Sequence, residues 1–492
     1  MRFTGRSREL GILRTGFDKL DAQCIFVSGP PGAGTSTLVR HASKGRSGLS
    51  FRCPPRPDPL IRLSLRDRIE QTFHQTPIGS DLQQSETTHE SIAQSSDATL
   101  EWAHLFSLLL GQAEKNQPFI LTLDDAHRLT EARSRFEVAL ADALRKAQGS
   151  GIPFHVVLAG RAGSMPKVGL DFPITAPKTR IHVGPLPLRA AAPHLPGNEA
   201  YEKIRAYGVF GGYPGVLTHL DTKVTVGTNV RRLLLPDTGS LGDLPMTWLE
   251  TAIQTPTRYV AVLESLSKGE AGWSQLSQAI PDLTKAGQIA PYLKKLSELR
   301  LIHAHRSLDT RPHGRNTRYA LSDPFLAFWL RFILPWRSSE RDEEIVPYYA
   351  SEIRPRIRDH LQQVMAPVCR RHMEIDALET FGSNARDAGA IWNKEAEIPI
   401  AGTLGTGATY YGLCLWNPPA NRPSKPELTP LEQIDLSIRN TRYGFGREQR
   451  LRLVFTGRNT PNWLRREAAR RSDAHIINAS DMLGDTSDQG TS

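Results

Sequence analysis

Cysteine is scarce in this chain, with four among 492 residues. The four lie far apart in the sequence and form no Cys-x-x-Cys or Cys/His spacing, which argues against a disulfide framework and a zinc site. Long apolar runs are missing too. The most apolar stretch, 319–336, contains Asp323 and Arg331 and falls short of the roughly 20 residues that span a bilayer. We interpret it as core and expect no membrane partner. The basic N-terminus lacks an apolar stretch of signal-peptide length, so we expect a cytoplasmic protein.

Neither sign of charge dominates the composition. The 61 Lys and Arg residues against 51 Asp and Glu leave a formal net charge of +10, which permits contact with nucleic acid or anionic nucleotides. With 39% hydrophobic and 23% charged residues, the chain is neither collagen, nor a coiled-coil rod, nor wholly disordered. At about 100–200 residues per domain, a chain of 492 residues should divide into two to four domains.

A phosphate-loop pattern follows the first expected strand. Residues 23–29 form an apolar run rich in β-forming residues, the turn GPPGAG follows, and TSTLVRHAS has helical character. In the pattern G-x-x-x-x-G-K-[ST], small residues let backbone N–H groups close around phosphate oxygens at a helix N-terminus. The predicted nucleotide-contacting residues of this loop are Gly29, Pro30, Pro31, Gly32, Ala33, Gly34, Thr35, Ser36 and Thr37.

The loop lacks the lysine that contacts the β- and γ-phosphates in this pattern. Thr35 stands in its place, and no shift of register restores a lysine, while Ser36 remains where a hydroxyl ligates Mg²⁺. The backbone donors and the helix dipole do not depend on the missing side chain, so we expect weakened binding of ATP or ADP. Hydrolysis should be slow or absent, because charge developing on the transferred phosphoryl group needs cations.

A strand ending in two carboxylates supplies the second half of such a site. It is ILTLDD at 120–125, in which Asp124 is predicted to hold Mg²⁺ through water and Asp125 to act catalytically by polarising the attacking water. A further apolar strand is expected at 154–160, and strands alternating with helices predict a parallel sheet covered on both faces. A fold that keeps only its sheet packing and binds no nucleotide stays open as the alternative.

The pattern changes after the turn GGYPG at 211–215. Residues 258–301 predict three short helices, and the runs LIHAH and TRYALSD after them predict a two-stranded hairpin; together these make a winged helix. From about Ala385, short strands near EIPIAG, TYYGLCLW and RLRLVFTG alternate with two helices, which predicts an α/β C-terminal domain. The polar stretch 77–99 is expected on the surface, and residues 485–492 should form a frayed tail.

Several motifs together resemble the archaeal-type P-loop ATPases, relatives of the STAND and origin-recognition ATPases. They are FTGRSREL, GPPGAGTST, LTLDDAHRL, VLAGRAGSM, VGPLPLRAA, FGGYPGVL and RYALSDPFLAFWLRF. The resemblance covers nearly the whole chain, and its most specific motif is RY-x-L-x-DPF-x-x-FW at 318–329. It implies an α/β fold with a P-loop NTPase domain, a winged-helix domain and a C-terminal domain that looks like a restriction-endonuclease core.

The resemblance also implies roles for residues outside the loop. Arg6 and Glu9 match positions that line the base pocket. Gly212 and Pro214 match a turn that joins the nucleotide domain to the winged helix and helps it sense the bound state, although the turn also reads as a plain linker. Arg161 stands where such ATPases often carry a small polar sensor. Two interpretations of this arginine stay open, an approach to the γ-phosphate and a surface salt bridge.

The expected C-terminal domain departs further from the family pattern. Nucleases with this core place Asp at the end of one strand and Glu-x-Lys on the next, so that two carboxylates bind Mg²⁺ and the lysine orients water. Where the family's stretches resemble EIDxV and GECKW, this chain reads EIPIA and GLCLW. Pro399, Leu413 and Leu415 replace the three catalytic residues. We therefore expect a folded domain with no metal site and no nuclease activity.

Two basic runs raise the question of a nucleic-acid partner. Residues 285–318 hold eight Lys and Arg against two acidic residues, including Arg306, Arg311, Arg315 and Arg318 on or beside the expected wing. Residues 439–471 hold ten arginines against two glutamates, together with Tyr443, Phe445 and Trp463. Such surfaces suit phosphate contacts and base stacking. Solvated arginines and core aromatics are the alternative, and a protein partner is also open.

These observations lead to one functional hypothesis and one alternative. The hypothesis is a regulatory ATPase-like switch that binds ATP or ADP, with Mg²⁺, at residues 1–220 and relays its state through a winged helix at 221–340 and an inactive endonuclease-like domain at 341–484. The alternative is a non-enzymatic DNA-binding or scaffold protein that has lost nucleotide binding. Whether the chain is an enzyme turns on the hydrolysis that Thr35 puts in doubt.

Overall fold

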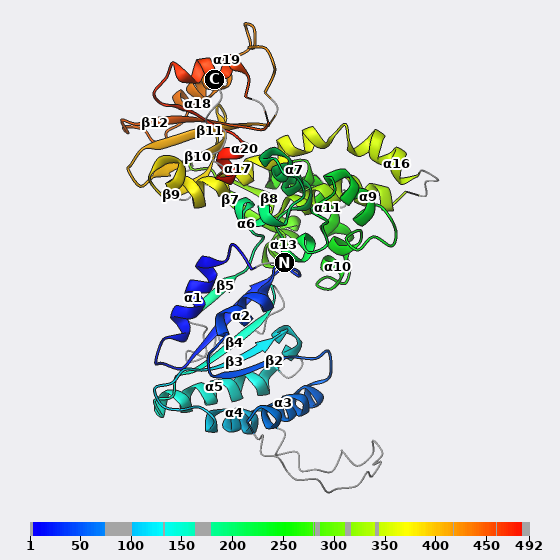
Figure 1. Ribbon diagram of the computed structural model, residues 1–492, viewed down its shortest axis with the longest axis vertical. Helices are drawn as coiled ribbons and strands as arrows, with labels where there is room; N and C mark the ends of the chain where they lie inside the picture. The colour runs from blue at the N-terminus through cyan, green and yellow to red at the C-terminus, as the bar shows by residue number, and fades with distance from the viewer. Residues whose placement is uncertain are drawn as a thin grey trace. The chain divides into compact units, whose positions relative to one another are not determined.

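The computed structural model describes residues 3–73, 101–130, 133–162, 179–278, 280, 286–309, 316–339, 344–416, 418–458 and 460–484. The chain divides into two compact units, and Figure 1 labels their helices and strands. We call them the N-terminal unit, Arg6–Gly184, and the C-terminal unit, which consists of Met1–Gly5 and Pro185–Ser492. The expected polar excursion at 77–99 and the expected tail at 485–492 lie outside the described residues.

A five-stranded parallel sheet forms the centre of the N-terminal unit (Figure 1). Its strand order is β2-β3-β4-β1-β5, and every neighbouring pair is parallel. The predicted parallel sheet is thereby confirmed. All seven residues of β1 are buried, as expected for a central strand covered on both faces. The strands are β1 (Gln23–Gly29), β2 (Gly48–Arg52), β3 (Phe119–Asp124), β4 (Phe154–Arg161) and β5 (Thr179–His182).

Helices cover both faces of this sheet. Helices α1 (Ser7–Phe17) and α2 (Thr35–Ser43) contact each other on one face, where a side chain at Gly16 of α1 would meet Ile25 of β1. The other face carries α3 (Asp58–Phe73), α4 (Trp102–Gly111) and α5 (Arg133–Gly149). Their apolar residues form one buried cluster with β1 to β4, to which Phe26, Leu105 and Phe136 belong. Because parallel strands end at the same edge, the loops after β1, β3 and β4 lie together there.

Short helices open the C-terminal unit. They are α6 (Leu188–Ala191), the 3₁₀ turn η4 (Ala192–His194), α7 (Ala200–Phe210), α8 (Pro214–Leu217), α9 (Val226–Leu233) and α10 (Leu244–Glu250). The turn between α7 and α8 is the GGYPG segment. Its Gly211 has φ of 64°, a left-handed conformation that favours glycine and ends α7.

Further helices and a small antiparallel sheet follow. The helices are α11 (Thr257–Ser267), α12 (Trp273–Gln278), the 3₁₀ turn η5 (Ala286–Ile289) and α13 (Ala290–Glu298). The sheet has the order β6-β8-β7, with β6 (Ala271–Gly272), β7 (Ile302–Arg306) and β8 (Thr317–Leu321). The three helices and the hairpin lie where the sequence predicts them, whereas the two-residue strand β6 was not predicted.

The apolar stretch after β8 is core. It forms α14 (Pro324–Phe328), a π-helical turn η6 (Trp329–Ile333) and α15 (Leu334–Arg337), and from Phe325 to Ile333 only Arg331 is not buried. The chain continues into α16 (Ile345–Tyr348) and η7 (Tyr349–Ile353). Among the described helices, none combines the length and the apolar character that crossing a membrane requires.

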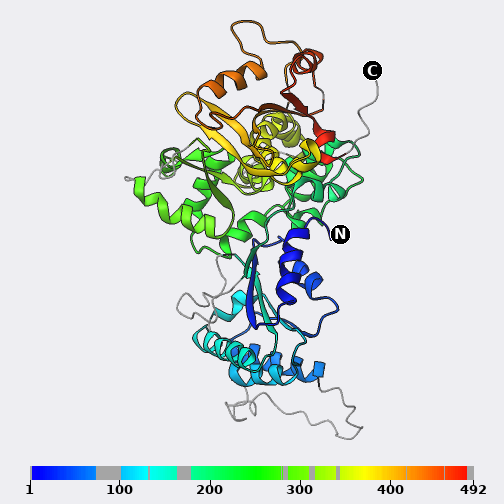
Figure 2. The ribbon, with the colours of Figure 1, turned by 90° about the vertical axis from the view of Figure 1, so that its left-hand side faces the viewer.

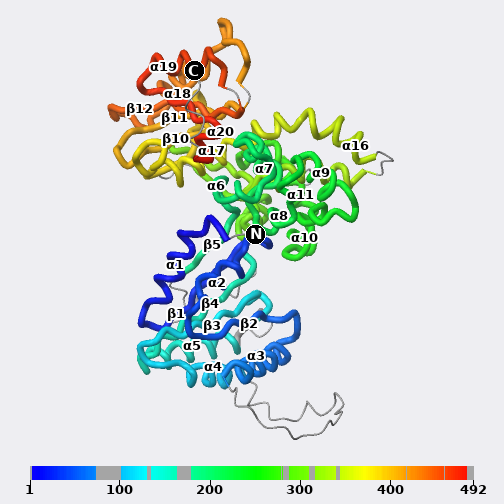
Figure 3. Tube along the Cα trace, in the orientation of Figure 1, coloured from blue at the N-terminus to red at the C-terminus, as the bar shows by residue number. Residues whose placement is uncertain are grey.

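The chain then builds a five-stranded sheet beside the long helix α17 (Ile357–Phe381), which Figure 2 shows from the side and Figure 3 traces along the Cα atoms. The strand order is β13-β12-β11-β10-β9; β9, β10 and β11 are antiparallel, and β11, β12 and β13 are parallel. The elements are β9 (Ala385–Trp392), β10 (Glu397–Leu404), β11 (Thr409–Leu415), α18 (Pro430–Arg439), β12 (Arg450–Thr456), α19 (Asn462–Ala469), β13 (Ala474–Ile477) and α20 (Ala479–Leu483).

The hairpin β7–β8 is joined to edge strand β9 of this sheet. The backbone N–H of Leu308, just after β7, donates to the carbonyl of Ala390 at 2.9 Å. The hydroxyl of Ser307 accepts from the backbone N–H of Trp392 at 2.9 Å. Asn316 and Trp392 exchange two hydrogen bonds, of 3.1 and 2.6 Å. We call this contact the hairpin–β9 joint; it gives backbone partners to a strand that would otherwise expose its edge.

Candidate nucleotide-binding site

The loop between β1 and α2 has the geometry of an anion-binding turn. The backbone N–H of Ala33 donates to the carbonyl of Pro30 at 3.1 Å, and Gly34 precedes α2 with φ of 87°. A side chain at Gly29 would lie 2.4 Å from the carbonyl oxygen of Val183, so only glycine fits there. No acidic residue occupies the first turn of α2. The N–H groups at this helix start therefore face a region where the dipole favours negative charge.

The remaining loop residues differ in exposure. Pro30 is buried, Pro31 and Thr35 are partly buried, and Gly32 and Thr37 are exposed. Thr35 begins α2, so the position of the missing lysine lies where the loop meets the helix. The hydroxyl of Thr35 would be 3.2 Å from a side chain added at Gly29.

Arg6 lies behind the loop, at the start of the N-terminal unit. Its side chain is 5% exposed, and its Nη2 donates to the carbonyls of Ala33 at 3.0 Å and Gly184 at 2.6 Å. An ion pair of 3.4 Å links it to Glu9. The sequence assigned Arg6 to a base pocket by resemblance alone; the bonds to Ala33 and Gly184 give it a second role, support of the phosphate loop, which local sequence did not reveal.

Ser36 and Asp124 meet at the edge of the sheet. The Ser36 hydroxyl donates to Oδ1 of Asp124 at 2.9 Å, and the backbone N–H of Asp125 donates to the same oxygen at 3.0 Å. A hydroxyl and a carboxylate are the oxygen ligands that Mg²⁺ prefers. Within the described residues there is no cluster of three or more His, Cys, Asp or Glu that could hold a metal by itself.

Asp125 is engaged by two arginines. Nε of Arg52, the last residue of β2, lies 2.9 Å from its Oδ2, and Nη2 of Arg128 lies 3.5 Å from the same atom. Asp125 also has φ of 54°, an uncommon conformation for a residue with a side chain. The carboxylate that the sequence predicts to polarise water is therefore paired with two arginine side chains. Sequence reasoning missed Arg52, which lies 73 positions away.

Arg161 ends β4, the strand between β1 and β3. It is the register partner of Gly29, the first residue of the loop, and is partly buried. Nearby His127, in the 3₁₀ turn η3 (Ala126–Thr130), has its pKa lowered by burial and then by the positive charge of Arg161, while Asp125 opposes the shift. Arg161, His127 and the Asp125 carboxylate are thus close enough to influence one another electrostatically.

The turn predicted to join domains is held by a buried carboxylate within the C-terminal unit. Oδ2 of Asp323 accepts from the backbone N–H of Gly212 at 2.9 Å, and Oδ1 accepts from Phe325 at the start of α14 at 2.9 Å. Asp323 belongs to the DPF motif and is 3% exposed. Gly211 packs against it so closely that an added side chain would lie 1.8 Å from Oδ1. The two motifs that resembled the family are therefore one packed unit.

The expected nuclease positions are packed with apolar neighbours. Leu413 and Leu415 of β11 lie partly buried against an apolar cluster, which we call the sheet cluster. It includes Tyr411, also of β11, and Leu431 of α18. Pro399 of β10 is partly buried, and its carbonyl accepts from Nη1 of Arg370 at 2.8 Å. These positions offer packing surface and one backbone oxygen that is already used.

The first basic run is partly used in the hairpin–β9 joint. The guanidinium of Arg318 lies 4.7 Å from the ring centroid of Trp392, and its Nη1 is 2.7 Å from Oε1 of Glu397. Arg306 is exposed. Arg311 and Arg315, the other two predicted wing arginines, lie outside the described residues.

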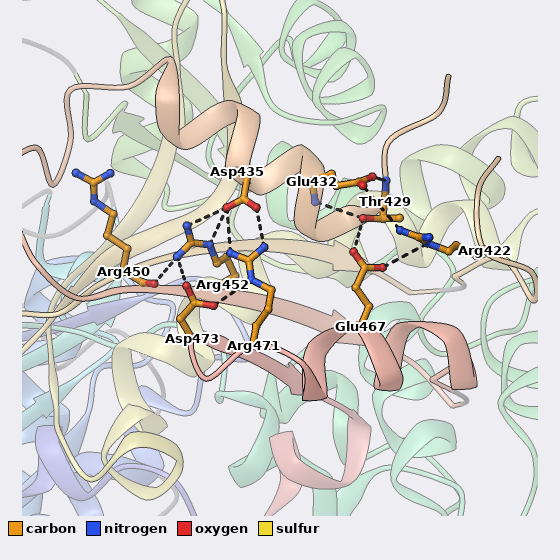
Figure 4. A network of polar contacts seen from close by, with 9 residues as sticks. All are labelled: Arg422, Thr429, Glu432, Asp435, Arg450, Arg452, Glu467, Arg471 and Asp473. Carbon is orange, nitrogen blue, oxygen red and sulfur yellow. Dashed lines mark hydrogen bonds and ion pairs between the residues drawn. The ribbon is translucent and has the colours of Figure 1, made fainter. Parts of the chain in front are cut away.

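The second basic run contains a closed group of ion pairs, drawn in Figure 4. Arg452 contacts Asp435 at 2.8 Å and Asp473 at 2.6 Å, and Arg471 contacts Asp435 at 2.6 Å and Asp473 at 3.1 Å. Asp435 lies on α18, Arg452 lies on β12, and Arg471 follows the end of α19. These two arginines are neutralised by neighbours and add little to a phosphate-binding surface.

The three aromatic residues of this run differ sharply in exposure. The Tyr443 hydroxyl donates to Oδ1 of Asp387 at 2.7 Å, and Nε1 of Trp463 donates to the carbonyl of Pro419 at 3.1 Å; both rings pack partly buried on the sheet cluster. Phe445 is 87% exposed. It stands between Gly444 and Gly446, which have φ of 73° and 79°.

Comparisons with known sequences agree with the fold of the N-terminal unit. Residues 2–163 match the family described as AAA ATPase domain. An uncharacterised protein of Methanocaldococcus jannaschii is 24% identical over 148 residues, which make up 30% of this chain and 33% of that protein. The chain thus matches only 33% of the length of this relative.

A solved structure gives the same result for the fold. A Walker-type ATPase of Pyrococcus abyssi is similar with a TM-score of 0.50 and 18% identity, over 67% of this chain and 96% of that one. Drosophila ORC bound to DNA has a TM-score of 0.29 and 15% identity, over 67% of this chain and 87% of that one. A STAND protein with a tetratricopeptide repeat sensor from Pyrococcus horikoshii has a TM-score of 0.25 and 12% identity, over 77% of this chain and 51% of that one. The N-terminal unit has the P-loop NTPase fold with a central parallel sheet.

Proposed function

We propose that the protein binds ATP or ADP at the loop 29–37 and acts as a regulatory, ATPase-like switch that hydrolyses nucleotide slowly or not at all. The observation that carries this proposal is the contact of 2.9 Å between the Ser36 hydroxyl and Asp124. It brings the two oxygen ligands of a Mg²⁺ site together beside a loop whose backbone suits phosphate. Ser36 and Asp124 would hold the ion, which supplies positive charge to the phosphates.

Two features support slow hydrolysis. Thr35 offers no charge to the transferred phosphoryl group, and Asp125 is paired with Arg52 and Arg128 rather than open toward a water. Because phosphoryl transfer depends on positioned cations and an oriented nucleophile, both features weaken the chemical step more than ground-state binding.

For the C-terminal unit we propose two modules. The helices α11, α12 and α13 with the sheet β6-β8-β7 have the element order of a winged helix, and α17 with β9 to β13 has that of a restriction-endonuclease-like core. The domain bounds near residues 220, 340 and 484 remain part of this proposal. Leu413 and Leu415, packed on the sheet cluster, support a core without nuclease activity.

Calorimetric titration of the full chain with ATP and ADP, with and without Mg²⁺, tests the nucleotide proposal. We expect saturable binding that Mg²⁺ strengthens, and we expect Ser36→Ala to remove the strengthening. Ser43→Ala is the matched control, because this hydroxyl lies at the other end of α2 and donates to the carbonyl of Val39 at 3.0 Å. No saturable heat with either nucleotide would overturn the proposal.

A second candidate function is single-stranded nucleic-acid binding at the turn that carries Phe445. An aromatic ring that is 87% exposed, close in sequence to the exposed Arg442 and Arg447, suits a base stacked on the ring with phosphates on the arginines. Exposed Glu448 opposes this attraction locally. We infer salt-sensitive and sequence-tolerant binding, since backbone phosphates supply most of the energy.

Fluorescence anisotropy with a labelled oligonucleotide at 50 and 200 mM salt tests this second function. We expect Phe445→Ala to weaken binding by about tenfold, the usual loss for one stacked base. Val346→Ala is the control, because Val346 is 57% exposed and lies outside the basic run. An affinity that is the same at 50 and 200 mM salt would contradict the assignment. An equal loss of affinity in both variants would also contradict it.

A further inference from the structure

Two of the four cysteines face each other inside the C-terminal unit, although 45 positions separate them in the chain. Cys369 lies in the middle of α17, and Cys414 lies near the end of β11. Their Sγ atoms are 4.0 Å apart, and both residues are buried free thiols. The spacing of cysteines along the sequence does not reveal this pair, because it arises from the packing of a helix on a strand.

A glutamine of α17 holds the end of β11 that carries Cys414. Nε2 of Gln362 donates to the carbonyl of Cys414 at 2.6 Å, and its Oε1 accepts from the backbone N–H of Trp416 at 2.9 Å. Gln362 precedes Cys369 by seven residues, which is about two helical turns, so both side chains project from the same face of α17. The two sulfur atoms are therefore kept opposite each other by a backbone contact on the same helix face.

The neighbouring strand β10 leaves this end of β11 to the helix. The pairing of β10 with β11 ends at Ile400 and Gly412, and Pro399, which comes next, has no backbone N–H to continue it. The carbonyl of Pro399 accepts from Nη1 of Arg370 of α17 at 2.8 Å. Helix α17 thus supplies hydrogen-bond partners where β10 does not, and its approach to β11 brings the two thiols together.

The other two cysteines lie in the N-terminal unit and are too far apart to pair with each other. Cys24 belongs to β1, and Cys53 directly follows β2, which the strand order places three strands away from β1. At about 4.8 Å between neighbouring strands, three spacings are roughly 14 Å, whereas a disulfide allows a Cα separation of at most about 7 Å. Both thiols are buried, so they serve as matched controls for the pair in the C-terminal unit.

We propose that Cys369 and Cys414 are a site of reversible disulfide formation that fastens α17 to β11, with a small organic disulfide such as oxidised glutathione as the oxidant. One protein thiolate attacks a sulfur of the oxidant, which leaves a mixed disulfide and releases one thiolate. The second protein thiolate attacks the protein sulfur of the mixed disulfide and releases the other. Two protein thiols are oxidised, two electrons reduce the oxidant, and the two protons pass to the released thiolates. Rotation of the two side chains about their Cα–Cβ bonds has to close the separation of the sulfur atoms to about 2 Å.

Burial sets the rate of this exchange. It raises the pKa of the Cys369 thiol, and the neighbouring Cys414 thiol raises it further, while Arg370 acts in the opposite direction. The thiolate is the nucleophile, and an oxidant reaches a buried sulfur only when the structure opens locally. We therefore expect the bond to form over minutes to hours, so that it responds to a lasting change in redox conditions.

Thiol mapping of the full chain tests the assignment. The protein is incubated at a series of ratios of oxidised to reduced glutathione, quenched with acid, unfolded, alkylated and digested. We expect the wild type to lose two of its four thiols, and mass spectrometry to find one pair of peptides joined through Cys369 and Cys414. Dithiothreitol should restore all four thiols. The thermal midpoint of the oxidised form, followed by tryptophan fluorescence, should rise by roughly 5–10 °C, because the bond closes a loop in the unfolded chain.

Single variants show which thiols are needed. Cys369→Ala and Cys414→Ala should each abolish the joined peptides and the rise in thermal midpoint. Cys24→Ala and Cys53→Ala also remove one buried thiol each but leave the pair intact, so they should behave like wild type. Mapping of the wild type needs no variant, so the test stands even if a variant fails to fold.

Three results of the mapping would overturn the assignment. They are four free thiols at every glutathione ratio, glutathione attached to one cysteine without a joined pair of peptides, and a bond that involves Cys24 or Cys53. An unchanged thermal midpoint in the joined form would overturn the role of the bond in fastening α17 to β11.

Discussion

Asp323 should make the stability of the C-terminal unit depend on pH. Burial raises the pKa of this carboxyl to about 7, although the two backbone N–H donors at Gly212 and Phe325 act in the opposite direction. The folded state therefore keeps a proton that the unfolded state releases near pH 4. The stabilisation is complete below pH 4 and is lost as the pH rises through 7.

A buried histidine gives the opposite slope, so a variant is needed to isolate Asp323. Burial lowers the pKa of His360 to about 4, so its contribution is complete above pH 6.5 and is lost as the pH falls through 4. In Asp323→Asn the side chain stays neutral at every pH. We expect the thermal midpoint of this variant to rise relative to wild type between pH 4 and 7. Tryptophan fluorescence measures it, since seven of the eight tryptophans lie in the C-terminal unit. A constant difference would contradict the prediction.

At the phosphate loop, Thr35→Lys should raise the affinity for ATP and ADP. Turnover should follow only in part, because Asp125 remains paired with Arg52. Adding Arg52→Ala removes one of its two cations, so we expect the double variant to release phosphate faster than Thr35→Lys alone. A steady-state phosphate assay checks this order. Equal rates in the two variants would show that the Arg52 pair does not limit the chemistry, and fast turnover in wild type would refute slow hydrolysis.

Some contacts of single residues follow from local sequence patterns, whereas others depend on which distant segments pair in the fold. The pattern 29–36 and the strand ending in Asp124 suffice to expect Ser36 and Asp124 at one edge, because parallel strands end there together. The pairing of Asp125 with Arg52 could not be predicted from the sequence, because it depends on the register of β2 against β3. The same holds for Arg6, whose partners are the carbonyls of Ala33 and Gly184.

At the scale of elements, β11 should not tolerate the charges of a nuclease. Leu413 and Leu415 pack against the helix–sheet cluster, so Leu413→Glu with Leu415→Lys places charged groups among apolar ones. We expect a loss of roughly 1–3 kcal/mol in unfolding free energy, within the range for polar groups placed at partly buried apolar sites. Denaturant unfolding followed by fluorescence measures it. Leu436→Glu on α18 is the control, because Leu436 is 49% exposed; an equal loss there would contradict the argument.

Elements with long periodic or apolar patterns were predictable, and short ones were not. The sequence predicted the bounds of β1 and β3 to within one or two residues. The phosphate loop follows β1, and the acidic pair Asp124–Asp125 lies at the end of β3. Strand β6 has two residues and carries no detectable alternation. Strand β9 reads ARDAGAIW, a mixed pattern because one end is exposed and the other is buried in the hairpin–β9 joint. Its partner residues lie about 80 positions earlier, which local periodicity does not register.

At the scale of the whole molecule, the protein should leave nucleic acid intact. Cleavage by the two-carboxylate mechanism needs a divalent ion held by anionic oxygens, and Pro399, Leu413 and Leu415 supply none. We expect single- and double-stranded DNA and RNA to survive incubation with the full chain in Mg²⁺ or Mn²⁺. Gel electrophoresis checks this. Cleavage that both EDTA and a substitution within 385–416 abolish would show a catalytic carboxylate elsewhere in that segment.

The hairpin–β9 joint limits how the C-terminal half can be divided. The predicted boundary between the two modules lies at residue 340. The backbone hydrogen bond from Leu308 to Ala390 and the paired contacts of Asn316 with Trp392 nevertheless join residues on its two sides. A fragment ending at 340 would leave Arg318 without its aromatic and acidic partners, and the complementary fragment would open the outer strand of a sheet to self-association. Recombination in evolution faces the same constraint, so the two modules should be inherited as a pair.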